Sequence, residues 1–437
     1  MRISVIGCGY LGAVHAACMA KLGHDVVGVD VDKSRIAELQ EGRAPFFEPG
    51  LPELLEEVLL AGRLKFSSTM ADIKGSQVHF LCVGTPQRKG EYAADLSHVD
   101  AAFNGLLDSV EPGNVIVGKS TVPVGTAARL ADLLHEQHPD AVLAWNPEFL
   151  REGFAVKDTL HPDRFVYGVP PGDSGARATA VLDGVYAASL AEGTRRLTAD
   201  YATAELVKAA ANSFLATKIS FINAMAVVCD AAGADVTLLA DAIGMDERIG
   251  RKFLNAGIGF GGGCLPKDIR AFMARAGELG ADQALTFLRE VDDINVRRRI
   301  RVVELTRTLV GGSLLGKRIT VLGAAFKPDS DDVRDSPALS IAAQLQLQGA
   351  EVTVTDPEAL GNARRRFPEL TYEPGLDAAM DKADALLLLT EWDAYRALSP
   401  AAAGALVRSR NILDGRNVLD AGHWRSAGWN YQGIGRP

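Results

Sequence analysis

The sequence is poor in cysteine, in aromatic residues and in excess charge of either sign. Its 437 residues include five Cys and 6% aromatic residues, and its net charge is −9, from 46 basic and 55 acidic side chains. No C-x-x-C pair or His/Cys cluster is present, which argues against disulfide scaffolds and metal sites and favours a reduced, cytoplasmic setting. An acidic chain has no global attraction for nucleic acid or anionic membranes, so any phosphate-binding surface must be local.

Long apolar runs are missing as well. The longest candidates, such as residues 385–389, have the length of a strand and fall short of the ~18 residues that a membrane helix needs. The N-terminus reads MRISVIGCGYLG, which predicts a strand and a glycine turn, not a signal peptide. The length predicts two or three domains, at ~100–200 residues each.

Strands and helices alternate in the first part of the chain. Helical stretches such as 10–22 and 124–135 separate short runs rich in Val and Ile, at 2–7, 25–30, 78–83, 115–118 and 141–145. This alternation predicts a parallel, doubly wound sheet. Residues 200–232 then predict one long helix, and more helices follow to about residue 310.

A strand–turn–helix pattern returns near the C-terminus, where GKRITVLGAAFKP (316–328) resembles the N-terminal segment. We therefore predict an α/β fold with two Rossmann-like, doubly wound parallel-sheet domains joined by a helical central domain. The expected boundaries are 1–198, 199–310 and 311–437. One larger α/β domain with a helical insertion is the alternative.

The first turn carries a dinucleotide fingerprint, Gly7-x-Gly9-x-x-Gly12, between a strand and a helix. These glycines allow a tight turn, a close approach to a pyrophosphate and close helix packing, respectively. Asp30 ends the second strand, where its carboxylate would bind the adenosine ribose and repel a 2′-phosphate. The pattern predicts NAD as the cofactor, and Arg35 is a candidate for the adenine side.

A second turn, GFGGGCLPKD (259–268), combines glycines with a cysteine. Consecutive glycines cost backbone entropy, so we expect the chain to pass close to a ligand here. Pro266 suits the first turn of a helix, which places Cys264 just before the helix and next to Lys267. Both features lower a thiol pKa, and they predict a nucleophilic cysteine with Asp268 close by.

Two further pairs are spaced four residues apart. Lys208 and Asn212 share one face of the long helix and are suited to hold a developing oxyanion, although spacing alone also fits a solvated face. Asn146-Pro147 has the pattern of a helix start, which would place Glu148 and Glu152 on one side of a helical turn.

Taken together, these motifs resemble the nucleotide-sugar 6-dehydrogenases over essentially the whole chain. The resemblance rests on the first glycine turn and on six later segments: VGTP (83–86), KSTVPVGT (119–126), NPEFLREG (146–153), ELVKAAANSF (205–214), GFGGGCLPKD (259–268) and GAAFKPDSDDVRDSP (323–337). It implies a four-electron oxidation of a sugar C6 alcohol to a carboxylate, with two NAD⁺ and a cysteine thioester.

The resemblance also implies residue roles. Cys264 is the nucleophile, Lys208 and Asn212 hold the oxyanion, and Asp268 works with Lys208 in proton transfer. Glu148 serves thioester hydrolysis. Glu152 lies near the nicotinamide and bound water, and Thr121 contacts a catalytic carboxylate or water. Residues expected to contact NAD are Gly7, Gly9, Tyr10, Leu11, Gly12, Asp30, Arg35, Thr85, Thr121, Glu152, Lys267 and Arg334. Residues expected to contact the sugar nucleotide are Glu148, Phe149, Leu150, Arg151, Glu152, Lys208, Asn212, Arg248, Asn255, Gly259, Phe260, Gly261, Cys264, Phe326 and Lys327.

The motifs also bear on the identity of the substrate. NPEFLREG followed by HPDR (161–164) resembles the UDP-glucose group, while GDP-mannose and other UDP-hexoses remain alternatives. The family also implies a homodimer through the long helix, or a higher homo-oligomer. A two-electron dehydrogenase would need neither Cys264 nor a second sheet, and an NAD-binding scaffold would not explain Cys264, Lys208 and Glu148 together.

Overall fold

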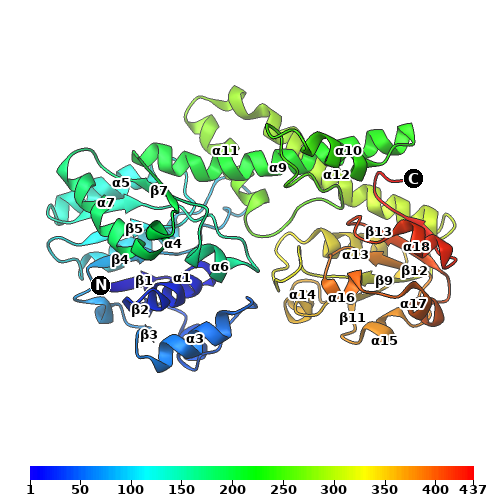
Figure 1. Cartoon of the computed structure of the whole chain (residues 1–437), viewed down its shortest axis with the longest axis horizontal. Helices are drawn as coiled ribbons and strands as arrows, with labels where there is room; N and C mark the ends of the chain where they lie inside the picture. Colours follow the sequence, from blue (N-terminus) through cyan, green and yellow to red (C-terminus); the bar gives the residue numbers. More distant parts are fainter. The chain divides into compact units, whose positions relative to one another are not determined.

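The computed structural model describes residues 1–437, which fold into two compact units. The first comprises residues 1–211 and 270–280, and the second comprises 212–269 and 281–437. Each unit contains one sheet flanked by helices, so the predicted fold class with two doubly wound sheets is confirmed (Figure 1).

The first unit is built on an eight-stranded sheet with the order β3-β2-β1-β4-β5-β6-β7-β8. All neighbouring strands are parallel except β6 and β7, which pair antiparallel at Trp145 and Gly168. β3, β7 and β8 are absent from the strands predicted above. The strands are β1 (Arg2–Ile6), β2 (Asp25–Val29), β3 (Leu64–Ser67), β4 (Val78–Leu81), β5 (Val115–Gly118), β6 (Val142–Trp145), β7 (Arg164–Gly168) and β8 (Arg195–Ala199).

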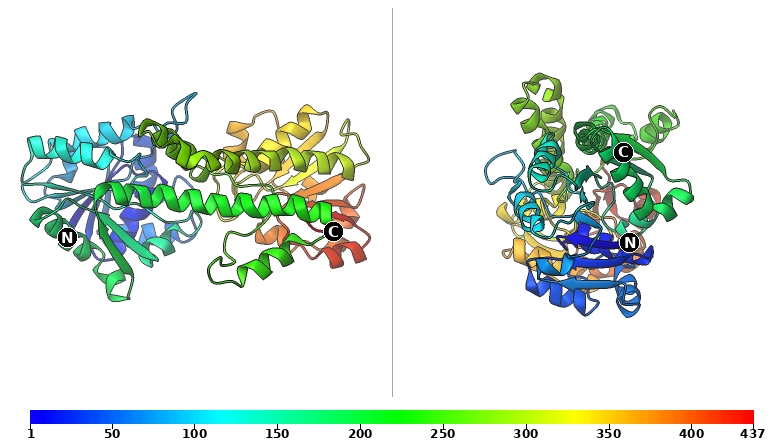
Figure 2. Two further views of the ribbon diagram at one scale, coloured as in Figure 1. Left: turned by 90° about the horizontal axis from the view of Figure 1, so that it is seen from above. Right: turned by 90° about the vertical axis from the view of Figure 1, so that its left-hand side faces the viewer.

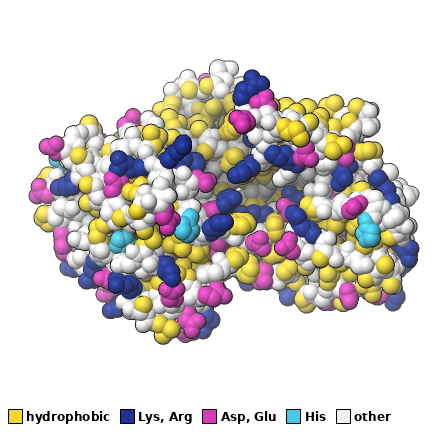
Figure 3. Space-filling model, in the orientation of Figure 1, with side chains coloured by type: hydrophobic (Ala, Val, Ile, Leu, Met, Phe, Trp, Pro, Cys, Tyr) yellow, Lys and Arg dark blue, Asp and Glu magenta, His cyan; other side chains and the backbone are white.

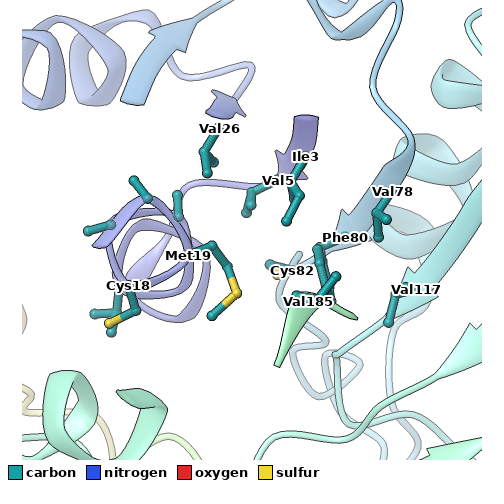
Figure 4. Packing of buried hydrophobic residues seen from close by; sticks show 14 of the residues in the cluster. Ile3, Val5, Cys18, Met19, Val26, Val78, Phe80, Cys82, Val117 and Val185 are labelled. Carbon is teal, nitrogen blue, oxygen red and sulfur yellow. The ribbon is translucent and has the colours of Figure 1, made fainter. Parts of the chain in front are cut away.

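Helices cover both faces of this sheet because its strands carry apolar side chains on both sides. One core lies between the sheet and α1, α3 and α7, where Met19 of α1 faces Val5 and Phe80 of the strands, while Cys18 lies on the side of α1 that points away from them (Figure 4). A second core lies under α4 and α5. The helices are α1 (Tyr10–Lys21), α2 (Lys33–Gln40), α3 (Leu51–Leu60), α4 (Ser97–Leu107), α5 (Thr126–Gln137), α6 (Ala155–Leu160), α7 (Asp173–Val185) and α8 (Ala187–Ala191).

The predicted long helix is α9 (Tyr201–Ala232), a single uninterrupted helix (Figure 2). Its first eleven residues belong to the first unit and the remainder to the second. By length and composition alone, α9 also meets the test for a membrane span, which the sequence analysis did not anticipate for any segment. Core helices of soluble proteins share this length and composition.

The second unit contains a six-stranded, all-parallel sheet with the order β11-β10-β9-β12-β13-β14. Its strands are β9 (Arg318–Leu322), β10 (Glu351–Thr355), β11 (Thr371–Tyr372), β12 (Ala385–Leu388), β13 (Asn411–Asp414) and β14 (Asn430–Gln432). Its helices are α10 (Val236–Gly244), α12 (Thr286–Leu309), α13 (Pro337–Leu347), α14 (Leu360–Arg366), α15 (Leu376–Met380), α16 (Asp393–Arg396), α17 (Pro400–Leu406) and α18 (Ala421–Ser426). α11 (Leu265–Glu278) begins here and ends in the first unit.

Candidate active site

The turn between β1 and α1 has the geometry of a phosphate cradle. Gly7 adopts a positive φ of 90°, and a Cβ on Gly12 would lie 1.7 Å from the Gly7 carbonyl oxygen. A Cβ on Gly9 would meet no atom within 4 Å, so the protein itself does not require glycine there. Because α1 has no side-chain cap, its first turn can offer backbone N–H groups to an anion. The turn therefore fits a dinucleotide pyrophosphate.

Asp30 lies at the end of β2 and is tied to this turn. Its Oδ2 accepts hydrogen bonds from the Cys8 backbone N at 2.7 Å and from Arg35 Nη1 at 3.0 Å. Its Oδ1 accepts from the Asp32 backbone N at 2.9 Å. A carboxylate oxygen can accept two hydrogen bonds, so Oδ1 retains capacity for a ribose hydroxyl. Arg35 contacts Asp30 and Asp32 here, and its predicted contact with adenine stays a prediction.

Tyr10 contributes to the structure behind the turn. Its hydroxyl donates to Glu48 and accepts from the Gly153 backbone N at 3.1 Å. Glu48 is buried and also accepts from the backbone N of Gly153 and Ala155. This network fixes the segment before α6. Leu11 packs against the hydrophobic core.

Glu148 forms a buried ion pair that the sequence analysis missed. Its Oε2 lies 3.0 Å from the Nζ of Lys119, which follows β5. Its Oε1 accepts from the backbone N of Phe149 and Leu150 at 2.7 and 2.9 Å. Burial raises the pKa of Glu148, but Lys119 and the two backbone N–H groups outweigh burial and hold the pKa below its usual value. Glu148 is therefore ionised at neutral pH.

The predicted helical turn at 146–152 is wrong, because this segment is an irregular loop and α6 begins only at Ala155. Asn146 does not act as a helix cap. Its Oδ1 instead accepts from Lys119 Nζ and from the Tyr186 hydroxyl, and its Nδ2 donates to the Val166 carbonyl. Glu148 and Glu152 therefore do not share a helix face.

Lys208 lies near the same loop. Its Nζ is 5.5 Å from the centroid of the Phe149 ring, and the guanidinium of Arg164 is 4.0 Å from that centroid. The structure thus brings Lys208 of α9 to the segment that carries Glu148. Arg151, in contrast, is held by Asp158 through two side-chain hydrogen bonds of 2.8 and 2.7 Å, and Leu150 packs against the core.

Thr121 and Thr85 join the loops that follow β5 and β4. The Thr85 hydroxyl donates to the Thr121 carbonyl at 2.8 Å, which holds the two loops together at the carboxyl edge of the sheet. This is the edge at which doubly wound sheets bind ligands. Glu152 is half-buried in the loop before α6.

In the second unit, Cys264 immediately precedes α11, as the sequence predicts. Its carbonyl accepts the first helical hydrogen bond, from the Asp268 backbone N at 2.9 Å, and its side chain is exposed. Asp268 is buried, and its two oxygens accept from Lys267 Nζ and from Asn212 Nδ2, both at 2.6 Å. Asn212, Lys267, Asp268 and Cys264 therefore form one group around the start of α11.

The glycines of this turn also have a cause within the chain, and the expected close approach to a ligand stays a prediction. Added Cβ atoms on Gly261, Gly262 and Gly263 would lie within 3 Å of Asp335, Phe326 and Arg334, respectively. The turn packs against residues 326–335 of the same chain, and this packing favours glycine at 261 and 262 without any ligand, whereas at 263 the collision is only with the flexible end of the Arg334 side chain. It also brings Phe326 and Arg334 next to the residues before Cys264, and the Gly262 backbone N donates to the Arg334 carbonyl at 2.9 Å.

The remaining predicted contacts are distributed over the second unit. The Asn295 amide exchanges two hydrogen bonds with the Phe260 backbone, and a Cβ on Gly259 would collide with it. Asn255 Oδ1 accepts from Arg251, and Lys327 Nζ lies 5.4 Å from the Phe326 ring. Arg248 is largely exposed and is bound to Asp246 two residues earlier.

Two other groups were also missed, half-buried Arg416 in the second unit and buried Glu205 in the first. Arg416 donates from its guanidinium to the carbonyls of Gly259, Phe326 and Leu389, which ties the cysteine turn to the second sheet. Glu205 of α9 accepts from the backbone N of Gly125 and Ala127 at 2.8 and 2.7 Å and so caps α5. Burial raises the pKa of Glu205 to about 7, although these backbone N–H groups oppose the shift. Glu205 is the first residue of the segment ELVKAAANSF (205–214), but nothing in that segment predicts the cap, and none of the motifs above contains Arg416.

Comparison with known proteins gives a consistent result over the whole chain. Three models of the UDP-glucose/GDP-mannose dehydrogenase family match: the NAD binding domain at residues 1–188, the central domain at 202–297 and the UDP binding domain at 320–421. A UDP-glucose 6-dehydrogenase from Rhizobium meliloti is 40% identical, with all of both chains covered.

Solved structures agree. A UDP-glucose dehydrogenase from Pyrobaculum islandicum is 37% identical with a TM-score of 0.90, and the match covers 100% of this chain and 98% of that one. A UDP-D-ManNAc dehydrogenase from Pyrococcus horikoshii is 29% identical with a TM-score of 0.87, covering 100% and 99%.

Proposed function

Because the chain belongs to the UDP-glucose/GDP-mannose dehydrogenase family, we propose that it oxidises UDP-glucose to UDP-glucuronate through a covalent intermediate on Cys264. It is an NAD-dependent dehydrogenase, and relatives at about 40% identity carry the name UDP-glucose 6-dehydrogenase. We assign NAD binding to residues 1–198, the central helical domain to 199–310 and the UDP-sugar to 311–437.

The observation that carries this proposal is the group around Cys264. The thiol is exposed at the start of a helix, where the first-turn N–H groups favour a thiolate. At the same helix start, Asp268 is hydrogen-bonded to the neighbouring Lys267 and to Asn212 of α9. A two-electron dehydrogenase has no use for a nucleophilic cysteine, whereas oxidation to a carboxylate requires water to be added to an aldehyde carbon.

In the proposed reaction, one alcohol and one water are converted to a carboxylate, two NAD⁺ are reduced and three protons are released. Bound NAD⁺ accepts a hydride in each oxidation. The Cys264 thiolate adds to the aldehyde carbon, and the thiohemiacetal is oxidised to a thioester. Water then attacks the acyl carbon, the C–S bond breaks and the thiolate returns.

Other residues take roles that follow their chemistry. We assign Lys208 and Asn212 to the C6 oxygen while it carries negative charge, and Asp268 to proton transfer. Glu148, an ionised carboxylate, orients or deprotonates the hydrolytic water. Lys327 contacts the diphosphate of the sugar nucleotide, Arg334 contacts NAD and Arg248 contacts the substrate of a neighbouring subunit.

We also propose a homodimer through the helices of the second unit. Phe214, Phe221 and Val228 lie seven residues apart on α9 and are 65%, 47% and 57% exposed, which forms an apolar stripe. Hydrophobic side chains also gather on the surface over α10 and α12 (Figure 3). Light scattering of Phe221→Lys should show a shift toward monomer, and an unchanged mass would contradict this interface. We place the enzyme in the cytoplasm, where reduced cysteines persist.

The test of the proposed function is a product count. Purified protein with UDP-glucose and excess NAD⁺ should form two NADH and one UDP-glucuronate for each UDP-glucose consumed. One NADH per substrate would refute the cysteine mechanism. Turnover of GDP-mannose without turnover of UDP-glucose would overturn the substrate assignment.

A further inference from the structure

Lys119 is a buried lysine directly behind Glu148. It follows β5, its backbone N donates to the Leu81 carbonyl at 3.0 Å, and the residue is 4% exposed. Burying an ammonium group is costly unless hydrogen bonds and an opposite charge compensate it. The contacts of its Nζ therefore indicate what this lysine does.

All three hydrogen-bonding directions of the ammonium group are used. Its Nζ lies 3.0 Å from Glu148 Oε2, 3.1 Å from Asn146 Oδ1 and 3.5 Å from the Tyr186 hydroxyl. Tyr186 in turn donates to Asn146 Oδ1 at 2.8 Å. Asn146 and Tyr186 thus fix the direction in which Lys119 meets Glu148.

Glu148 is the more accessible partner. Its side chain is 18% exposed, against 5% for that of Lys119. One oxygen is held by two backbone N–H groups and the other by Lys119, so the carboxylate has one orientation. Lys119 can therefore reach a reacting group only through Glu148.

The groups packed around this pair are neutral at physiological pH. Burial lowers the pKa of His15 and raises the pKa of Cys18 of α1 and of Cys82 after β4. Burial also raises the pKa of Tyr167 of β7 and of Tyr186 between α7 and α8. Two other cations, Lys208 of α9 and Arg164 of β7, lie over the ring of the neighbouring Phe149. Lys119 is the cation that contacts the Glu148 carboxylate itself.

We propose that Lys119 is a positioning residue, which keeps Glu148 ionised and correctly oriented for hydrolysis of the Cys264 acyl intermediate. This inference rests on the proposed function. During hydrolysis a proton passes from water to Glu148, the water oxygen bonds to the acyl carbon and the C–S bond breaks. Lys119 makes Glu148 a weaker base but keeps it in the carboxylate form at every pH at which the enzyme works.

The test measures hydrolysis separately from hydride transfer, between pH 5.5 and 8.5. Stopped-flow NADH formation reports the oxidations, and intact-protein mass spectrometry reports the acyl adduct on Cys264. In the wild type, hydrolysis should show no acid limb from Glu148. Lys119→Gln removes the cation that contacts the Glu148 carboxylate, so the pKa of Glu148 should rise. For each unit by which this pKa exceeds the assay pH, the ionised fraction of Glu148 falls about tenfold. We expect adduct accumulation and a hydrolysis rate that falls at least tenfold at pH 6 but recovers as pH rises.

Two further variants separate this role from a structural one. Lys119→Arg keeps a permanent charge, so its hydrolysis profile should stay flat even if its rate falls. In a Glu148→Gln background, Lys119→Gln should cost no more than about twofold, because a residue that acts through Glu148 has nothing left to act on. Lys65→Gln, at an exposed lysine of β3, is the matched control.

The outcomes are distinct. A Lys119→Gln profile identical to that of the wild type, or an equal loss with and without Glu148, overturns the inference. If Lys119→Gln does not fold, Lys119→Arg takes its place in the test. A hydrolysis rate that falls at low pH in Lys119→Arg would then overturn the inference. Failure of the wild type to oxidise UDP-glucose would refute the proposed function instead.

Discussion

Asp30 and Asp356 occupy the same position in the two sheets. Each follows the second strand of its sheet, and each accepts hydrogen bonds from the backbone of the turn after the first strand. Asp356 differs because it is saturated: its Oδ2 accepts from Ala324, Ala325 and Trp392, and its Oδ1 accepts from two further backbone N–H groups. The second sheet has therefore kept the carboxylate as a structural brace, while Asp30 retains room for a ribose.

We predict that Asp30 determines the choice of cofactor. Asp30→Ala should raise the KM for NAD⁺ about tenfold or more, since it removes a charged hydrogen bond of ~1.5–3 kcal/mol. It should also increase the use of NADP⁺ relative to NAD⁺, because the repulsion of a 2′-phosphate is lost. Steady-state kinetics with both cofactors measure the ratio. Asp32→Ala, which removes the nearby cap of α2, is the control, and an equal effect there would contradict our placement of the ribose.

Cys264→Ala should abolish UDP-glucuronate formation and leave NAD⁺ affinity within a few-fold of the wild type. The substitution removes the nucleophile but none of the groups around the first glycine turn. Product analysis and fluorescence titration with NAD⁺ provide the two readouts. Cys229→Ala, at a buried cysteine of α9, is the control. Its folded fraction should keep full activity, even if the substitution lowers the stability of the protein. Normal acid production by Cys264→Ala would exclude the covalent mechanism.

Glu148→Gln should stop the reaction after both oxidations. It keeps the shape of the side chain but removes a base, for which losses of ~10²–10⁴-fold are typical. A rapid burst of about two NADH per active site should precede a nearly halted steady state, with a sugar nucleotide attached at Cys264. A slow enzyme with no burst and no adduct would make Glu152 the better candidate for hydrolysis.

Glu205 should make stability depend on pH. Its pKa in the folded protein is about 7, above the ordinary value of 4.5, so the folded state binds the proton more tightly than the unfolded state does. The contribution of Glu205 to the free energy of unfolding is most favourable below pH 4.5 and is lost as the pH rises through 7. The total change is on the order of 3 kcal/mol.

Glu205→Gln should remove this slope, so the wild type should lose stability relative to the variant between pH 5 and 8. Urea unfolding at several pH values measures the difference. Parallel curves for the two proteins would show that Glu205 is ionised throughout this range.

The sequence predicts local structure well where the local residues themselves determine the backbone conformation. Gly7, Gly9 and Gly12 are spaced for a strand–turn–helix, and Pro266 begins a helix directly after Cys264. The uninterrupted helical pattern of 200–232 is α9 almost residue for residue. β7 shows that a signal can be overlooked, because its sequence RFVYG is rich in β-branched and aromatic residues.

Tertiary contacts explain what the pattern could not predict. Asn146 looks like a helix cap, but its acceptor oxygen is taken by Lys119 and Tyr186, which lie 27 and 40 residues away in the chain. The three glycines before Cys264 predict close approach to a ligand, but their packing against a segment more than 60 residues later could not be predicted from the pattern. Lys119, Glu205 and Arg416 owe their roles to partners distant in sequence, and no spacing rule identifies such residues.

The first turn also has a consequence for libraries of variants. At Gly12 a side chain would collide with the Gly7 carbonyl, so substitutions there should disappear from any pool selected for soluble expression. At Gly9 the added atom meets only open space, so such variants should survive that selection and be lost only when cofactor capture is demanded. Gly12 and Gly9 belong to one motif but are thus required for different reasons. Gly12 is required for the chain to fold, and Gly9 is required for it to bind the cofactor.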